Sequence, residues 1–129
     1  MEPRYPLDRV VAVATDGGDV LLAQTRASRI VADYVEGLVD AERFVRAVVA
    51  GLRHEHFEQT VELTEPPYRG AFDVYLTPLA AELVERHGLD HVRTWYVKLK
   101  LVESEEGDSV VCVSLHPAER ASKKKGTKP

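Results

Sequence analysis

Hydrophobic residues recur along the chain with two different periods, and the period changes near residue 57. Before that point, apolar side chains return at helical spacing in three stretches: 7–14, 28–38 and 41–52. Apolar residues three and four positions apart lie on one face of a helix, so each stretch predicts an amphipathic helix. Gly17 and Gly18 are expected to end the first helix and Asp40 to cap the third, with a brief extended piece at 20–25 between the first two.

Beyond residue 57, apolar and polar residues alternate, which is typical of half-buried strands. Such runs occur at 57–65, at 70–76 and twice within 94–116, where they flank the loop ESEEGD. Helical spacing returns only after the second run, where Thr77 is the expected N-cap, Pro78 the first helical residue and Gly88 the stop. The order of elements predicts an α+β domain, with the N-terminal helices packed on one face of a mostly antiparallel sheet.

The composition suits one domain with a substantial core. The chain has 129 residues, of which 44% are hydrophobic and 29% charged. We expect this domain at 1–118, followed by a basic disordered tail at 119–129, whose four lysines are either simply solvated or an auxiliary phosphate contact.

The net charge of −4 argues against a general affinity for nucleic acid. A single cysteine, Cys112, excludes an internal disulfide framework and fits a reducing cytoplasm. With neither a signal-peptide pattern nor an apolar run of membrane-spanning length, a cytoplasmic protein without a membrane partner is expected.

The last two strands predict a hairpin whose two faces differ in chemistry. Pairing them around the centre of the loop gives three apolar pairs on one face: Val97 with Leu115, Leu99 with Val113, and Leu101 with Val111. The same register gives three pairs on the other face: Tyr96 with His116, Lys98 with Ser114, and Lys100 with Cys112. Because a slip by one residue moves every apolar side chain to the other face, the apolar match favours this register.

The second face gathers a phenol, an imidazole, two ammonium groups and a hydroxyl, without a carboxylate. Such a set does not suit a divalent metal. It suits a phosphodiester, since lysine stabilises the phosphate and histidine or tyrosine transfers protons. In RNA the 2′-hydroxyl supplies the nucleophile, so no metal and no cofactor is expected. The alternative is a solvated sheet face without chemistry, the usual state of an antiparallel sheet.

Other candidate residues lie outside the polar side of the hairpin. Tyr68 and Arg69, in the turn PPYRG, offer a stacking ring and a guanidinium for nucleic acid, or are an ordinary exposed turn. His54 and His56 lack a third ligand at suitable spacing, so no metal site is expected there. Trp95 belongs to the apolar face of its strand, where packing in the core is expected.

The order of several short motifs resembles that of the MqsR (motility quorum-sensing regulator) family, toxins of bacterial toxin–antitoxin pairs with a RelE-like fold. The resemblance covers roughly residues 6–117. It is carried by the N-terminal helical region and by four short motifs: Phe57 in HF, the triplet Asp73-Val74-Tyr75, Tyr96 and Lys98 in YVKLKL, and Val113-Ser114 in VVCVSL. The resemblance implies a type II toxin, a ribosome-independent and metal-free mRNA endoribonuclease (interferase) that acts on single-stranded mRNA. It also implies a 2′,3′-cyclic phosphate or related product end and a cognate antitoxin protein as partner.

The sequence departs from the family pattern at several positions. Gln59 stands where the family has a catalytic lysine, Phe72 where it usually has glutamine, and His116 where it has another lysine. The segment PLAAELVERHG is an additional helix of about ten residues relative to the family. An imidazole can serve as a general acid or a general base, so His116 can replace part of the lost function.

These considerations assign roles to seven residues. The expected catalytic residues are Tyr96, His116, Lys98 and Gln59, and the expected RNA-binding residues are Arg69, Lys100 and Tyr68. Tyr96 and His116 exchange protons, Lys98 and Arg69 stabilise the phosphorane, and Gln59 orients the phosphate or the 2′-hydroxyl. The alternative is a catalytically silent module that keeps the fold and binds RNA or a protein, which the missing lysine and glutamine and the acidic net charge favour.

Overall fold

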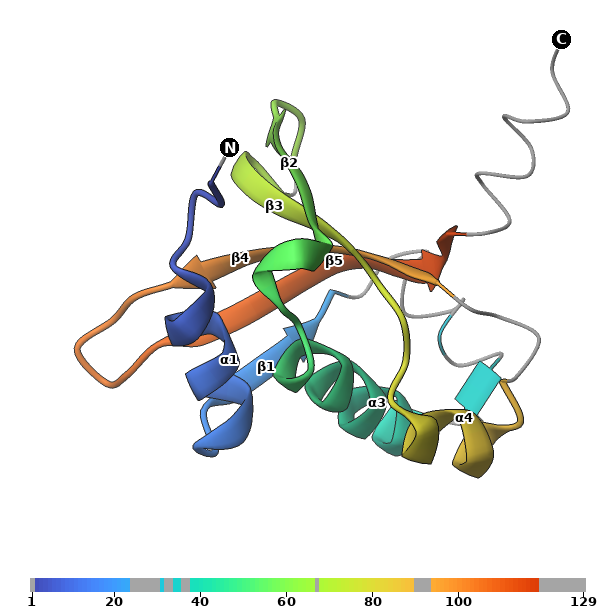
Figure 1. The fold of residues 1–129 in the computed structure, drawn as a ribbon. Helices are drawn as coiled ribbons and strands as arrows, with labels where there is room; N and C mark the ends of the chain where they lie inside the picture. Colours follow the sequence, from blue (N-terminus) through green and yellow to red (C-terminus); the bar gives the residue numbers. More distant parts are fainter. Residues whose placement is uncertain are drawn as a thin grey trace, which may run out of the picture.

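The computed structural model describes residues 2–23, 31, 34–35, 38–66, 68–89 and 94–118 (Figure 1). The helices are α1 (Leu7–Thr15), α3 (Leu38–Ala50) and α4 (Ala81–His87), with a short 3-10 helix at His54–His56. The strands are β1 (Asp19–Leu22), β2 (Phe57–Leu63), β3 (Gly70–Thr77), β4 (Trp95–Val102) and β5 (Ser109–Pro117). The helix predicted at 28–38 lies mostly outside the described residues, as does the tail predicted at 119–129. Within the described ranges, no helix has the length and apolar character needed to cross a bilayer.

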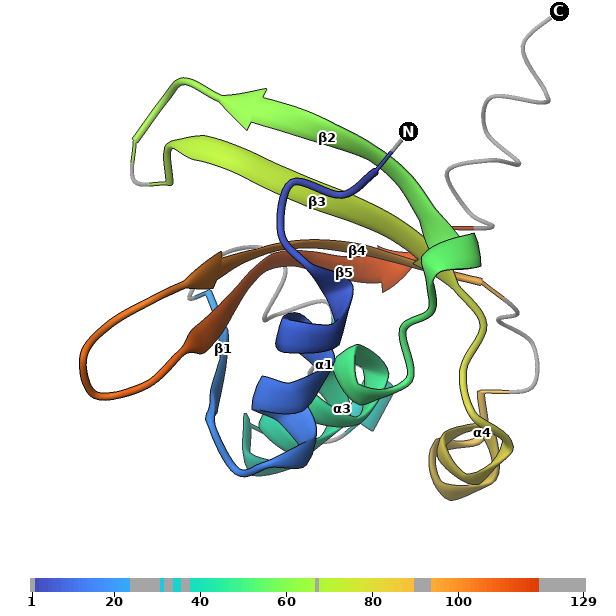
Figure 2. The ribbon, with the colours of Figure 1, turned by 60° about the vertical axis from the view of Figure 1, so that its left-hand side comes forward.

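The five strands form one mixed sheet in the order β1-β5-β4-β3-β2. The strands from β2 to β5 pair in antiparallel fashion, whereas β1 runs parallel to β5. Figure 2 shows α1, α3 and α4 on one side of this sheet. The predicted α+β class and the mostly antiparallel pairing are therefore confirmed. The parallel pair with β1 was not predicted, because a four-residue strand carries no information about its partner.

The core lies between the helices and the sheet. Phe44 on α3 packs edge-on against Trp95 on β4, with 5.1 Å between ring centroids, and Tyr34 packs against the same indole at 5.3 Å. Trp95 is fully buried, as predicted from its strand position. Each aromatic pair of this kind adds about 0.5–1.5 kcal/mol to the apolar burial itself.

Two predicted helix starts are wrong. Asp40 lies within the described helical run Leu38–Ala50, so it does not occupy the position before the first helical residue. Thr77 is the last residue of β3, opposite Trp95, and its hydroxyl donates to the Pro78 carbonyl at 3.0 Å instead of accepting from a helix N–H. The α4 helix begins only at Ala81. Its predicted end is confirmed: Gly88 adopts the left-handed conformation, with φ +63°, that favours glycine at this position.

The predicted β4–β5 register is correct in one half of the hairpin and wrong in the other. Val97 lies opposite Leu115, Tyr96 opposite His116 and Lys98 opposite Ser114. Beyond Lys98 the register shifts by one, so the partners are Leu99 with Cys112, Lys100 with Val111 and Leu101 with Val110. Val113 is the extra residue of a β-bulge, which interrupts the strict alternation of faces along β5. The prediction had paired Leu99 with Val113, Leu101 with Val111 and Lys100 with Cys112, and these three pairs are absent.

The bulge exchanges the environments of two neighbours. Cys112 becomes part of the main core and is fully buried. Val113 joins a smaller apolar cluster with Phe72 and Ala23. A continuous apolar alternation in the sequence cannot reveal such an exchange, since both residues are compatible with either face.

Asp73, in the motif that carried part of the resemblance, has a structural role. Its buried carboxylate accepts hydrogen bonds from the backbone N–H groups of Arg4 and Tyr5, each at 2.9 Å, and from the Thr60 hydroxyl at 2.5 Å. A buried charge needs such partners. Asp73 therefore attaches the N-terminal segment to the middle of the sheet.

Candidate functional site

Five of the residues selected from the sequence lie on the side of the sheet opposite α1, α3 and α4. We call this set the polar face: Tyr96, Lys98, Lys100, Ser114 and His116. In β4 its members alternate with fully or largely buried core residues, so the hairpin has one face in the core and one with polar groups. All five residues are half-buried.

Tyr96 and His116 form a stacked pair at one end of the polar face. Their ring centroids are 4.8 Å apart and their planes differ by 12°. The two residues are direct partners across β4 and β5, in the half of the hairpin that the bulge leaves in register. The predicted neighbourhood of phenol and imidazole is thus present.

A hydrogen bond of His116 defines which of its ring nitrogens can act as a base. Nδ1 of His116 lies 3.2 Å from the carbonyl oxygen of Pro117. A carbonyl only accepts, so Nδ1 carries the proton when this hydrogen bond forms, and Nε2 is then the basic nitrogen of the neutral ring. Burial raises the pKa of Tyr96 above the ordinary 10.0. The phenol therefore stays protonated at neutral pH and can donate.

The two lysines of the polar face sit over aromatic rings. Nζ of Lys98 is 5.8 Å from the Tyr96 ring centroid, and Nζ of Lys100 is 5.2 Å from that of Phe72. Cation–π contacts of this length are worth about 0.5–1 kcal/mol where solvent is near. The ammonium group of Lys98 consequently lies beside the Tyr96–His116 pair. Lys100, two residues further along β4, has its ammonium group over Phe72 instead.

Gln59 lies in the same row of the sheet as Lys98. The register places Gln59 opposite Val74, Val74 opposite Lys98, and Lys98 opposite Ser114. Directly opposite residues share a face, and neighbouring strands are about 4.8 Å apart, so the Gln59 and Lys98 backbones are roughly 10 Å apart. Gln59 is exposed on the edge strand β2, where its amide can contact a ligand that spans the polar face.

Tyr68 and Lys98 line the same hollow, although they are far apart in sequence. This hollow has a volume of about 400 Å³, and its described lining residues are Glu62, Leu63, Thr64, Glu65, Tyr68, Lys98, Val113 and Ser114. Tyr68 is half-buried and packs against the cluster of Ala23, Phe72 and Val113. The sequence prediction placed Val113 on the apolar face of the hairpin, and its position in this hollow depends on the bulge.

Arg69 lies in the loop just before β3, and its side chain is exposed. The preceding residue, Tyr68, lines the hollow beside Lys98. The guanidinium of Arg69 is therefore accessible to a ligand that extends from this hollow over the loop.

Phe72 occupies the position where the resembling family usually has glutamine. Its side chain is fully buried in the small apolar cluster, under the ammonium group of Lys100. The position therefore contributes packing and cannot present a polar group to a ligand.

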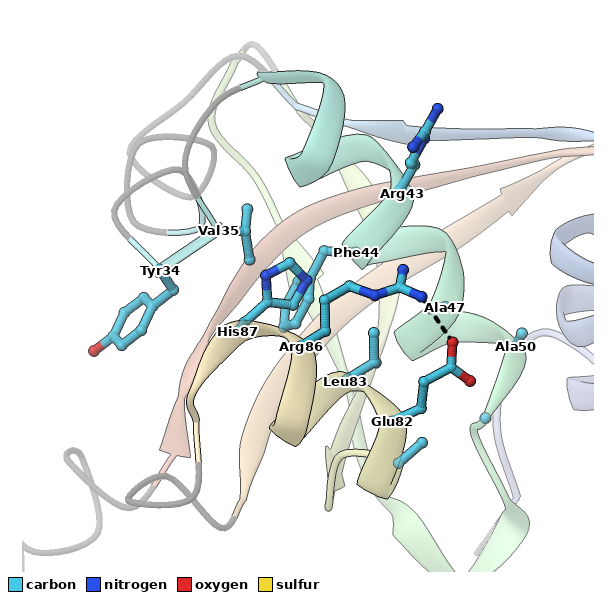
Figure 3. A pocket seen from close by; sticks show the side chains of 12 residues that line it. Tyr34, Val35, Arg43, Phe44, Ala47, Ala50, Glu82, Leu83, Arg86 and His87 are labelled. Atoms are coloured by element: carbon cyan, nitrogen blue, oxygen red, sulfur yellow. Dashed lines mark hydrogen bonds and ion pairs between the residues drawn. The ribbon is translucent and has the colours of Figure 1, made fainter.

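A larger groove of about 900 Å³ lies between α3 and α4, on the helical side of the molecule (Figure 3). Phe44, Ala47 and Leu83 form its apolar part, and an ion pair of 3.0 Å between Arg86 and Glu82 lies at its edge. None of the residues selected from the sequence lines this groove. Its lining also includes Tyr34, Glu82 and His87. The Glu82 carboxylate is paired with Arg86, and the His87 ring packs edge-on against Phe44, so in the described residues these groups have structural contacts.

Comparisons of the chain with models of known protein families, with curated proteins and with solved structures gave no match. A functional proposal therefore depends on the chemistry of the polar face and on the motif resemblance.

Proposed function

We propose that the protein is a metal-independent endoribonuclease that cuts single-stranded mRNA, acting as the toxin of a type II toxin–antitoxin pair. The observation that carries the enzymatic part is the stacked Tyr96–His116 pair with the Lys98 ammonium group beside it. The RelE-like fold and the antitoxin partner are supported by the motif resemblance and are compatible with helices on one face of a mostly antiparallel sheet.

The chemistry that follows is transesterification at phosphorus. Nε2 of His116 accepts the proton of the 2′-hydroxyl, and O2′ attacks the adjacent phosphorus. The bond from phosphorus to the 5′-oxygen breaks, and this oxygen takes a proton from the Tyr96 phenol. The products are a 2′,3′-cyclic phosphate and a 5′-hydroxyl, and the proton on His116 returns to the neighbouring phenolate. Lys98 stabilises the phosphorane, as preorganised cations do in related reactions.

Extended RNA would also contact residues beyond this centre. Gln59 is positioned to bind a phosphate or a 2′-hydroxyl across the sheet from Lys98, and Lys100 to bind the next phosphate along β4. Arg69, exposed in the loop before β3, would bind a phosphate of the same RNA strand. A splayed single strand is the form of RNA that such a surface can accept.

The decisive test compares His116→Ala with the wild type. We expect the wild type to arrest growth when it is expressed in bacteria, and to cleave purified single-stranded RNA in the presence of a chelator. General acid–base groups contribute about 100- to 10,000-fold, so His116→Ala should reduce kcat by that factor and Tyr96→Phe should do the same while keeping the ring stack. Product ends are identified by mass spectrometry.

The matched control is His54→Ala, which removes an exposed imidazole outside the polar face. This variant should cleave RNA at the wild-type rate. Equal rates for His116→Ala and the wild type would remove His116 from the mechanism. A wild type that neither arrests growth nor cleaves RNA would contradict the enzyme proposal itself.

A second candidate function is a catalytically silent module that binds RNA or a protein. It is favoured by two observations: Phe72 is buried where a polar residue would be needed, and Gln59 carries no charge. Such a module would bind RNA without product formation, and its affinity would be nearly unchanged by His116→Ala. Measuring binding and cleavage on the same RNA separates the two functions.

A further inference from the structure

The hollow beside Lys98 is lined by both polar and apolar groups. Lys98 and Ser114 belong to the polar face, while Leu63, Val113 and Tyr68 supply apolar and aromatic surface. Its volume of about 400 Å³ is within the range of small-molecule sites, which is about 300–1,000 Å³. The hollow therefore suits a group with a flat apolar body joined to a negative charge.

The β-bulge in β5 is what builds the apolar wall. Without the extra residue, Val113 would lie opposite Leu99 in the main core. With it, Leu99 pairs with Cys112, and Val113 lines the hollow next to Ser114. Bulges often occur beside functional sites, where they redirect a side chain. Here the bulge places the Val113 side chain in the same hollow as Ser114 and Lys98.

Tyr68 offers the aromatic surface for such a ligand. It belongs to the loop between β2 and β3, and it is half-buried because its ring packs on the cluster of Phe72 and Val113. A ring held in this way loses little conformational freedom when a ligand stacks on it. Base–aromatic stacking is a common way in which proteins bind single-stranded nucleic acid.

Charge orients the ligand within the hollow. Glu62 and Glu65 contribute to its lining and disfavour a phosphate near them, whereas Lys98 favours a phosphate. Lys98 is also the cation beside Tyr96, so a phosphate bound by it lies next to the stacked pair. The attached base would then extend toward Tyr68 and Val113.

We propose that this hollow is a base-binding subsite that holds one unpaired nucleobase, next to the phosphate at Lys98, by stacking on Tyr68 and contact with Val113. The identity of the ligand as RNA rests on the proposed function. The subsite selects unpaired over paired RNA, since a base inside a duplex cannot enter a hollow on a sheet face.

Binding is measured with a short 2′-O-methyl RNA that carries one 2-aminopurine, because blocking the 2′-hydroxyl prevents cleavage. Stacking on the ring should quench the 2-aminopurine fluorescence. Tyr68→Leu should weaken binding by about 5- to 100-fold and abolish the quench, whereas Tyr68→Phe keeps the ring and should keep both. Val113→Lys, which fills the hollow, should weaken binding similarly, and Val113→Ile is its apolar control. Thermal unfolding of each variant confirms that the fold is retained.

Cleavage assays of the same variants separate this proposal from the enzymatic one. If the wild type cleaves RNA, and Tyr68→Leu leaves KM, the cleavage positions and the quench unchanged, the subsite is wrong and the ribonuclease proposal stands. If the wild type cleaves nothing, yet Tyr68→Leu and not Tyr68→Phe weakens binding, the base site stands without catalysis. Equal binding by the wild type and Val113→Lys would also overturn the subsite.

Discussion

Cys112 illustrates how one residue's environment sets its chemistry. Its thiol is fully buried in the main core and donates to the Ser114 carbonyl at 3.2 Å. Burial raises the pKa of the thiol from 9.0 to about 12. The thiolate is the reactive form of cysteine, so Cys112 is a packing residue and not a nucleophile.

The shifted pKa predicts a pH dependence of stability. The unfolded thiol ionises from about pH 9, while the folded thiol stays protonated up to about 12. The free energy of unfolding should therefore fall as the pH rises through this window, by up to about 1.4 kcal/mol per pH unit. Urea unfolding near pH 8, 9 and 10 measures it, and Cys112→Ala should have a flatter profile. The range below about pH 10 matters most, because burial also raises the pKa of Tyr96 above 10.0, which adds a second pH dependence at higher pH. Equal profiles for the two proteins would show that the thiol is accessible to water.

At the level of elements, the turn between α1 and β1 contacts both α3 and the β4–β5 loop. The guanidinium of Arg46, on α3, donates to the carbonyls of Ala14 at 3.1 Å and Gly18 at 2.6 Å, which satisfies acceptors at the end of α1. Gly18 is also pressed against its surroundings. A Cβ at this position would be 2.9 Å from Cγ1 of Val13 and 3.2 Å from the backbone oxygen of Asp108.

This close approach predicts that Gly18→Ala destabilises the protein by about 1–3 kcal/mol, the usual effect of overpacking. Gly51→Ala is the matched control, because a Cβ there would find its nearest neighbours at 3.7 Å, an ordinary contact. That variant should be unchanged, or more stable by about 0.4–1 kcal/mol through the lower entropy of its unfolded chain. Urea unfolding of both variants gives the comparison. A Gly18→Ala protein as stable as Gly51→Ala would show that Val13 and Asp108 can move away from position 18 without cost.

At the level of the whole molecule, charge is divided between regions. The net charge is −4, yet Lys98 and Lys100 are on the polar face and no carboxylate is among its members. Glu103 and Asp108, at the β4–β5 loop, both pair with Arg9, at 2.6 and 2.7 Å, whereas Glu62 and Glu65 line the hollow beside Lys98. An acidic protein can therefore still present a basic surface to RNA, and repulsion elsewhere limits binding in other orientations.

This division predicts a modest salt dependence of RNA binding. Contacts of Lys98, Lys100 and Arg69 with phosphates would give a slope of log K against log salt of about −2, at roughly −0.7 per neutralised phosphate of a single strand. Lys98→Gln should make the slope less steep by about 0.7. Filter binding across a salt series measures this slope.

Removal of residues 119–129 should change the slope only if the tail lysines contact RNA. An unchanged slope in Lys98→Gln would mean that Lys98 binds no phosphate.

The sequence by itself determined the α+β class, the two faces of β4 and the pairing of its first half with β5. Period-2 alternation in β4 placed Trp95 in the core and Tyr96 on the other side, and the apolar match with β5 brought Tyr96 and His116 together. These are local consequences of side-chain geometry and burial, so they can be predicted from neighbouring residues.

Only the tertiary structure decided how distant segments meet. The bulge at Val113, the parallel pairing of β1, the burial of Phe72 and the hollow shared by Tyr68 and Lys98 each depend on contacts between segments far apart in the chain. An apolar residue in an alternating run is compatible with either environment. Whether such a residue lies in the main core or on the other face of the sheet depends on the side chains that pack against it. Those side chains come from distant parts of the chain, so the local sequence pattern does not contain them.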